Sequence, residues 1–171
     1  MTIPIIDIPL DLFYPQQEFV ECDASYSLYM GPRGEGKTAA GAIKLLRYHT
    51  EHPGARTIVA SASNDQLLQG VMPAIHKFFP AAYIKRRYWS PHPRLVLTDG
   101  GESLFYTADD PEKFRSLECH AFWVDEAAQV RERSFLQLQA CRRLPEFPNQ
   151  AWITTTPKGY QNWVTDRFIT R

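Results

Sequence analysis

This sequence of 171 residues has few cysteines, no excess of one charge and no long apolar run. The three cysteines, Cys22, Cys119 and Cys141, are odd in number and lack a CxxC spacing, which argues for reduced thiols and a cytosol-like compartment. Basic and acidic residues both number 19, so any contact with nucleic acid must come from a local patch. No apolar run approaches the roughly 18 residues of a membrane span, and no signal peptide is present, so we expect a soluble protein without a membrane partner.

Internal repeats and low-complexity tracts are also lacking, which excludes a solenoid or a long linker. A chain of this length that is 44% hydrophobic can bury the core of one domain, so we expect a single layered α/β domain over residues 1–171. The pair Cys119-His120 has no partner pair at metal-ligand spacing and is expected to lie in the core rather than to bind a metal.

The most informative stretch is GPRGEGKT, which fits the phosphate-binding pattern GxxxxGK[ST] at every fixed position. An apolar run over residues 25–30 predicts a strand before it, and the spacing of apolar residues over 38–49 predicts a helix after it. This order makes a chance glycine-rich turn the weaker interpretation. The expected nucleotide-binding residues are Gly31, Pro32, Arg33, Gly34, Glu35, Gly36, Lys37 and Thr38. Backbone N–H groups would surround the phosphates of ATP, Lys37 would reach the β and γ phosphates, and the Thr38 hydroxyl would bind Mg²⁺.

A second stretch, AFWVDEA, predicts a buried strand over residues 121–124 that ends in an acidic pair. Open α/β sheets bind their ligands at the carboxyl ends of strands, so Asp125 is expected to hold Mg²⁺ directly or through water. Glu126 would orient and deprotonate the attacking water. Such a pair can instead cap the following helix, but its combination with GPRGEGKT, called the P-loop below, makes the catalytic interpretation the stronger one.

The remaining stretches predict short elements around these two motifs. Residues 1–13 suit an extended arm, and residues 14–20 a short helix in which a glutamine, Gln16 or Gln17, could bond the edge of adenine or lie on the surface. The other expected elements are strands over 57–61 and 151–154, a helix over 66–79 kinked or split at Gly70 and Pro73, a hairpin of 94–98 with 103–107, and a helix over 134–143.

Two polar clusters can each be interpreted in two ways. The run Lys85-Arg86-Arg87 with Tyr88 and Trp89 could follow a phosphate backbone, or could be ordinary solvated surface. The threonines that follow the 151–154 strand could sense the γ phosphate, or could only cap the next turn.

In the order YPQQEF, GPRGEGKT, FRSLECHAFWVDEA and WITTTPKGYQNWV, these stretches resemble the ATPase half of the large terminase subunit, the DNA-packaging motor of tailed bacteriophages. The resemblance runs from about residue 14 to the end, and its most specific element is the strand that ends in TTTPKG with a tryptophan four residues on. It implies a P-loop NTPase fold of the ASCE, RecA-like type: a three-layer α/β sandwich with a mostly parallel sheet and an added antiparallel edge hairpin.

The resemblance also implies roles and partners. Arg33 would act on the phosphates from within the subunit, Arg115 would reach the nucleotide of a neighbouring subunit, and Gln16 or Gln17 would read adenine. Thr154, Thr155 and Thr156 match the coupling motif that links hydrolysis to movement. The implied partners are double-stranded DNA, further copies in a ring on a portal, and the small terminase subunit, in the cytoplasm of an infected bacterium.

The resemblance covers only the ATPase half of that family. The family's C-terminal nuclease is not expected in this chain, which ends at residue 171. Two alternatives stay open at this point: a helicase-type DNA translocase with the same core, and a nucleotide-binding scaffold that does not hydrolyse ATP.

Overall fold

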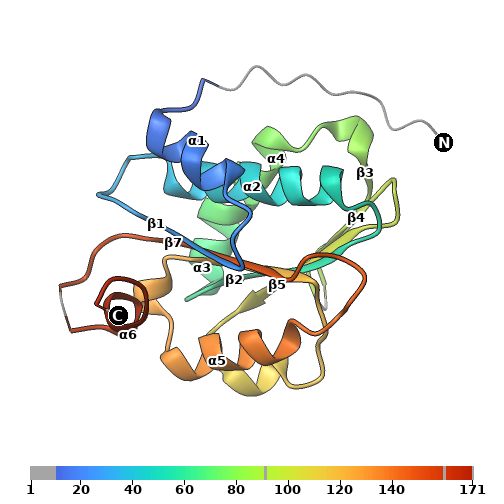
Figure 1. The fold of residues 1–171 in the computed structure, drawn as a ribbon. Helices are drawn as coiled ribbons and strands as arrows, with labels where there is room; N and C mark the ends of the chain where they lie inside the picture. The colour runs from blue at the N-terminus through green and yellow to red at the C-terminus, as the bar shows by residue number, and fades with distance from the viewer. Residues whose placement is uncertain (1–10, 91, 160, 171) are drawn as a thin grey trace.

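The computed structural model describes residues 11–90, 92–159 and 161–170. They contain one seven-stranded sheet in the order β1-β7-β6-β2-β5-β4-β3 (Figure 1). The strands are β1 (Tyr26–Met30), β2 (Arg56–Ser61), β3 (Ile84–Tyr88), β4 (Arg94–Leu97), β5 (Glu102–Thr107), β6 (Ala121–Asp125) and β7 (Gln150–Thr155). Neighbours from β1 to β5 are parallel, whereas β4 and β3 add antiparallel pairs at one edge. The expected α/β fold with a mostly parallel sheet and an antiparallel edge hairpin is confirmed.

Helices cover both faces of the sheet (Figure 1). On one face lie α1 (Tyr14–Glu21), α2 (Lys37–Glu51) and α4 (Met72–Phe78), and on the other lies α5 (Glu132–Cys141). Side chains alternate along a strand, so Trp123 of β6 joins the core under α2 and Phe122 joins the core over α5. The last helix, α6 (Trp163–Phe168), contributes to this second core. No helix in the described ranges is long and apolar enough to cross a membrane.

The helix after the P-loop packs very closely on β6. A Cβ atom at Gly41 of α2 would lie 2.3 Å from the Trp123 ring, so only glycine permits this approach. The Trp123 indole then donates a hydrogen bond to the Thr154 hydroxyl of β7, 2.8 Å away. These contacts fix the start of α2 above the two strands that carry Asp125 and Thr154.

The segment predicted as a kinked helix is divided into three parts. They are α3 (Asn64–Gln66), the π-helix η1 (Leu67–Val71) and α4. The division falls beside Gly70 and Pro73, as predicted, because proline lacks the N–H that would continue the helical hydrogen bonds. The 3₁₀-helices η2 (Ala81–Tyr83), η3 (Pro111–Phe114) and η4 (Ala127–Gln129) complete the connections.

The predicted helix over 14–20 is present as α1, whereas most of the predicted arm lies outside the described residues. Lys44 of α2 is buried and ties α1 down, because its ammonium group donates to the carbonyls of Phe19, Val20 and Cys22 at the end of that helix. Burial lowers the pKa of Lys44 to about 8. The position of α1 relative to α2 is therefore set by a polar contact as well as by packing.

Candidate functional site

The carboxyl ends of β1 and β6 open into a pocket of about 650 Å³. The P-loop and the acidic pair form one wall, and the start of α3 and η1 forms the other. The pocket is lined by Arg33, Gly34, Gly36, Lys37, Thr38, Ala39, Asp65, Gln66, Gln69, Gly70, Asp125 and Glu126. Thr38 and Asp125, which are 87 positions apart in the sequence, thus share one concave site.

The P-loop adopts a backbone conformation that requires glycine. Gly36 is the N-cap of α2 with a φ of 68°, a left-handed conformation that glycine adopts without steric cost. Lys37 follows directly and is only 6% exposed. Its ammonium group donates to the Pro32 carbonyl at 2.7 Å, so it is folded back onto the loop.

Asp125 is the buried acid of the site, with 3% of its surface exposed. Its carboxylate accepts a hydrogen bond of 2.6 Å from the Thr154 hydroxyl and lies 3.2 Å from the Thr38 hydroxyl. Burial raises the pKa of the Asp125 carboxyl to about 6, against the opposing effect of the hydrogen bond from Thr154. A bound cation would favour the ionised form of such a group.

The oxygen atoms of Thr38 and Asp125 fit Mg²⁺, which prefers hard oxygen ligands and is usually bound through one or two protein groups together with phosphates and water. Within the described ranges, no group of three or more histidine, cysteine or acidic side chains could hold a metal by itself. The donor set therefore suits a cation that arrives with a nucleotide.

Glu126 has an unusual backbone and a firmly held side chain. Its φ of 49° is the only positive φ of a non-glycine among the described residues, a conformation that costs about 1–2 kcal/mol for an L-residue. Thr156 donates to the Glu126 carboxylate from its backbone N–H at 3.1 Å and from its hydroxyl at 2.9 Å. Strained residues of this kind concentrate at functional sites.

The three threonines at the end of β7 contact the acidic pair and its loop rather than capping a turn. Thr154 bonds Asp125, Thr156 bonds Glu126, and the Thr155 hydroxyl accepts from the backbone N–H of Ala128 at 3.0 Å. The end of β7 is thus connected by hydrogen bonds to both carboxylates and to the loop behind them.

The two candidate glutamines lie in different places. Gln16 is 6% exposed, and its amide accepts from the Phe13 N–H and donates to the Glu35 carbonyl of the P-loop at 3.0 Å. Its Nε2 atom lies 2.5 Å from where a Cβ on Gly36 would be. Gln17 is exposed and bonds Glu21 within α1. Only Gln16 contacts the P-loop.

The two candidate arginines are also separated. Arg33 lines the pocket, whereas Arg115 follows η3, is about two-thirds exposed and pairs with Glu112 at 2.8 Å. Arg115 does not line the pocket of its own chain, so it is available at the surface.

Comparison with families of known proteins adds an independent finding to this geometry. Residues 28–171 match the family described as terminase large subunit, T4-like virus type, N-terminal. The chain belongs to this large terminase family. A search of curated proteins gives no match.

Solved terminases have the same fold at low sequence identity. The large terminase of a thermophilic bacteriophage is 13% identical with a TM-score of 0.77, and the match covers 94% of this chain and 43% of that one. The large terminase of bacteriophage HK97 is 19% identical with a TM-score of 0.66, over 88% and 34% of the two chains. The ATPase domain of the Thermus phage P74-26 large terminase is 20% identical with a TM-score of 0.54, over 86% and 65%. This terminase chain thus spans less than half the length of the first two proteins.

Sequence reasoning missed the far wall of the pocket in this terminase chain. There Gln66 accepts from the Ser61 hydroxyl at 3.3 Å and donates to Gln129 at 2.9 Å, so it bridges the end of β2 to η4. A glutamine in a predicted helix has many surface uses, and only the tertiary structure places this one opposite the P-loop. The π-helix that follows it is a feature often found at functional sites.

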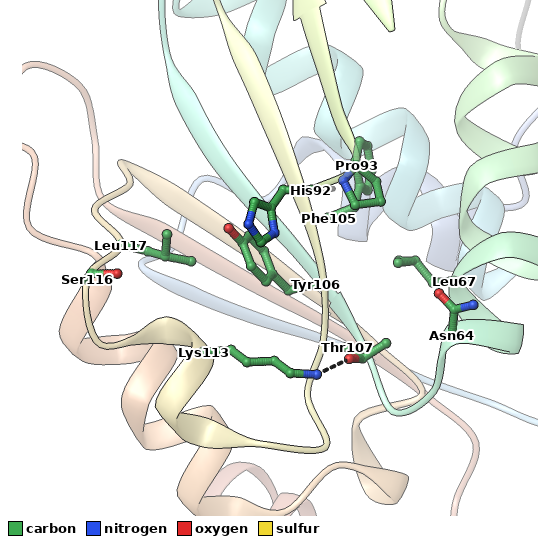
Figure 2. Close-up of a pocket in the computed structure, with 10 residues that line it drawn as sticks. All are labelled: Asn64, Leu67, His92, Pro93, Phe105, Tyr106, Thr107, Lys113, Ser116 and Leu117. Carbon is green, nitrogen blue, oxygen red and sulfur yellow. Dashed lines mark hydrogen bonds between the residues drawn. The ribbon is translucent and has the colours of Figure 1, made fainter. Parts of the chain in front are cut away.

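A second hollow of about 450 Å³ lies beyond the end of β5 (Figure 2). His92 stacks on Tyr106 in it with ring centroids 6.2 Å apart. The ammonium group of Lys113 donates to the Thr107 hydroxyl and pairs with Asp109 at 2.8 Å, which lowers the pKa of Asp109 to about 2. Lys113 is the one lysine or arginine among the described residues that line this hollow, and its ammonium group is already paired, so the hollow is poorly suited to a phosphate.

Proposed function

We propose that the chain is the ATP-hydrolysing motor domain of a large terminase, which powers movement of double-stranded DNA into a viral procapsid. The observation that carries the proposal is the meeting of the P-loop with Asp125 and Glu126 in one pocket, with Thr156 bonded to Glu126. Solved relatives support the choice of ligand, since the large terminase of the thermophilic bacteriophage is known in complex with ADP and with ATP-gamma-S.

In this proposal the P-loop residues Gly31 to Thr38 bind the phosphates of ATP. Lys37 leaves the Pro32 carbonyl and turns to the β and γ phosphates, a change that exchanges a bond to a neutral oxygen for bonds to negatively charged ones. Thr38 and Asp125 hold Mg²⁺, which supplies charge neutralisation for the phosphates when it is bound. Gln16 is the residue that would read adenine, because it already contacts the P-loop.

Glu126 is the proposed general base. Each carboxylate oxygen accepts one hydrogen bond from Thr156 and keeps another lone pair for the attacking water. The bonds from Thr156 fix the direction of the carboxylate, which favours proton abstraction from a positioned water. Arg33 would neutralise charge on the phosphates from within the chain.

The threonine contacts offer a physical route for coupling. A change at Glu126 on hydrolysis would act directly on Thr156 and hence on β7. A change at Asp125 would act on β7 through Thr154. We propose that Thr154, Thr155 and Thr156 transmit the state of the nucleotide to the segment that follows β7.

The proposed partners are double-stranded DNA, other copies of the chain in a ring on a portal, and the small terminase subunit, in the cytoplasm of an infected bacterium. The fold is shared with a protein of the bacteriophage phi-29 genome packaging motor assembly, at 17% identity and a TM-score of 0.61. Arg115 would complete the site of a neighbouring copy, and arginines supplied in this way are worth roughly 10³–10⁵ in rate.

Two experiments test this proposal. A Glu126→Gln variant should bind Mg-ATP but not hydrolyse it; a parent protein that binds ATP without turnover would instead favour the non-hydrolysing scaffold. Specific activity should rise with protein concentration, and the Arg115→Ala variant should lose that rise. Activity that is flat across a wide dilution series would contradict a role for Arg115 between subunits. A helicase-type translocase is the weaker candidate, because residues 28–171 match the terminase large subunit family.

A further inference from the structure

The outer edge of the sheet carries positive charge that the proposed ATP site does not use. Residues 84–98, which form β3, β4 and their connection, contain four basic residues and no acidic residue, in a chain whose net charge is zero. The four are Lys85, Arg86, Arg87 and Arg94, and all are exposed. Together with Tyr88 and Trp89 they are called the edge patch below.

The charges of the edge patch are not neutralised by the described part of the chain. The ion pairs among residues 11–90, 92–159 and 161–170 involve other basic residues, and none includes a member of the patch. By contrast, Arg56 of β2, further into the sheet, pairs with Glu102 of β5 at 2.6 Å. Four basic residues without an ion pair thus lie close together in the chain, on and between the edge strands β3 and β4.

Two of the guanidinium groups are already ordered on one face. Tyr88 lies opposite Arg94, and Arg86 lies opposite Val96, so these side chains share a face of the β3–β4 ribbon. Arg86 donates to the Tyr88 hydroxyl at 3.2 Å, and the Arg94 guanidinium stacks 4.3 Å from the centre of the Tyr88 ring. The alternate residues Leu95 and Leu97 are buried in the core on the other face.

The two faces of the β3–β4 ribbon thus have different surroundings. The leucine face, on which Arg87 lies opposite Leu95, packs on the core under α4, and the face with Arg86 and Arg94 is open. Side chains held in place before binding lose less conformational entropy when they contact a ligand. Trp89 follows β3 and is 52% accessible, and its ring centroid lies 5.6 Å from that of His76 in α4, so it borders the leucine face.

We propose that the edge patch contacts the phosphate backbone of double-stranded DNA, with Arg86 and Arg94 as the principal contacts. The choice of DNA as the polyanion rests on the proposed motor function; the location rests on the charge and geometry of the patch. None of its residues lines the nucleotide pocket, so the contact is separate from the chemistry. Phosphate contacts of this kind carry no base specificity, which suits a protein that must move along any sequence.

A competing explanation is that the charges only protect an exposed edge strand from pairing with other chains, a common use of basic residues at sheet edges. Protection needs charge on β3 but no affinity for DNA. The two explanations therefore differ in a measurable way.

The test compares two double variants with the same change in net charge. Arg86→Gln/Arg94→Gln removes the ordered pair of the patch, and Arg133→Gln/Arg143→Gln removes two exposed arginines that pair with Glu112 and Glu118. Binding of the whole chain to random-sequence duplex DNA is measured by fluorescence anisotropy over a range of salt concentrations, and thermal unfolding checks that both variants fold.

We expect the patch variant to bind more weakly and the slope of log K against log salt to become shallower by about 1.8, since each lost phosphate contact accounts for about 0.9. The control variant should keep the parent's slope. Equal losses in both variants, an unchanged slope in the patch variant, or no DNA binding by the parent would each overturn the proposal. Aggregation of the patch variant with an unchanged slope would establish edge protection instead.

ATP turnover without DNA is measured on the same preparations. If parent and patch variant hydrolyse ATP equally while DNA binding does not depend on the patch, the DNA contact is refuted and the motor function is not. If the parent lacks ATPase activity, the proposed function fails whatever the DNA measurement shows.

Discussion

The hydrogen bond between the Thr156 hydroxyl and Glu126 offers a sharp test of how the site works. Thr156→Val keeps the shape and β-branching of the side chain and the backbone N–H bond of 3.1 Å, but removes the hydroxyl bond of 2.9 Å. A hydrogen bond to a charged group is worth about 1.5–3 kcal/mol, and partial exposure of both residues favours the lower value. At about 1.36 kcal/mol for each factor of ten in rate, we expect kcat to fall about tenfold.

The Michaelis constant should change little, because Thr156 does not line the nucleotide pocket. Steady-state hydrolysis of Mg-ATP gives both parameters, and calorimetry checks that nucleotide binding is kept. Thr156→Ser restores the hydroxyl and should recover most of the rate. As a matched control, Thr155→Val leaves the Ala128 N–H without its acceptor, which should lower the free energy of unfolding by about 1–3 kcal/mol. A Thr156→Val enzyme as fast as the parent, or a serine variant as slow as the valine variant, would refute the reasoning.

Three further predictions concern stability. Burial raises the pKa of Asp125 from 3.8 to about 6, so the ionised carboxylate destabilises the nucleotide-free fold as pH rises from 4 through 6. Asp125→Asn should therefore raise the free energy of unfolding by roughly 3 kcal/mol at pH 8. The same variant should lose the rise in Tm that Mg-ATP gives the parent. Burial lowers the pKa of His49 from 6.5 to about 4, so the stability that the neutral imidazole contributes is complete above pH 6.5 and is lost as pH falls through 4. Chemical denaturation should show that the free energy of unfolding falls by roughly 3 kcal/mol over this range. The fall should be smaller in His49→Gln. Lys44→Met removes the lysine donor of the Phe19 and Cys22 carbonyls at the end of α1, whereas the Val20 carbonyl keeps its bond from Arg47. The variant should therefore lower the free energy of unfolding by about 1–3 kcal/mol and weaken ATP binding through Gln16. Unchanged affinity in calorimetry would show that α1 does not influence the site.

The parts of the fold that could be predicted from sequence are those in which a local pattern decides the structure. The P-loop and the strand before Asp125 are of this kind, because glycine spacing and four consecutive apolar residues act over a few positions. The hairpin of β4 and β5 follows from its turn residues in the same way.

The edge strand β3 could not be predicted from its own residues. Three consecutive basic residues hide the alternation of a strand, and only pairing with β4 gives the segment its conformation. Likewise, neighbouring glutamines in one helix cannot be distinguished until the packing of α1 on α2 turns Gln16 toward the P-loop.

The contact between Thr156 and Glu126 joins residues 30 positions apart. It exists because β7, the last strand in the described part of the chain, lies between β1 and β6 in the sheet. Strand order is a tertiary property, so the sequence pattern could indicate both groups but not their hydrogen bonds.

The central claim is that a nucleoside triphosphate binds at the P-loop between β1 and α2, with Asp125 and Glu126 facing it. Calorimetric titration of Mg-ATP into the Glu126→Gln variant tests this most directly, since hydrolysis does not interfere, and Lys37→Ala serves as the control. The account predicts a binding heat with one site per chain that is lost in the Lys37→Ala variant. A well-folded protein that gives no heat, or equal heat with and without the lysine, would contradict it.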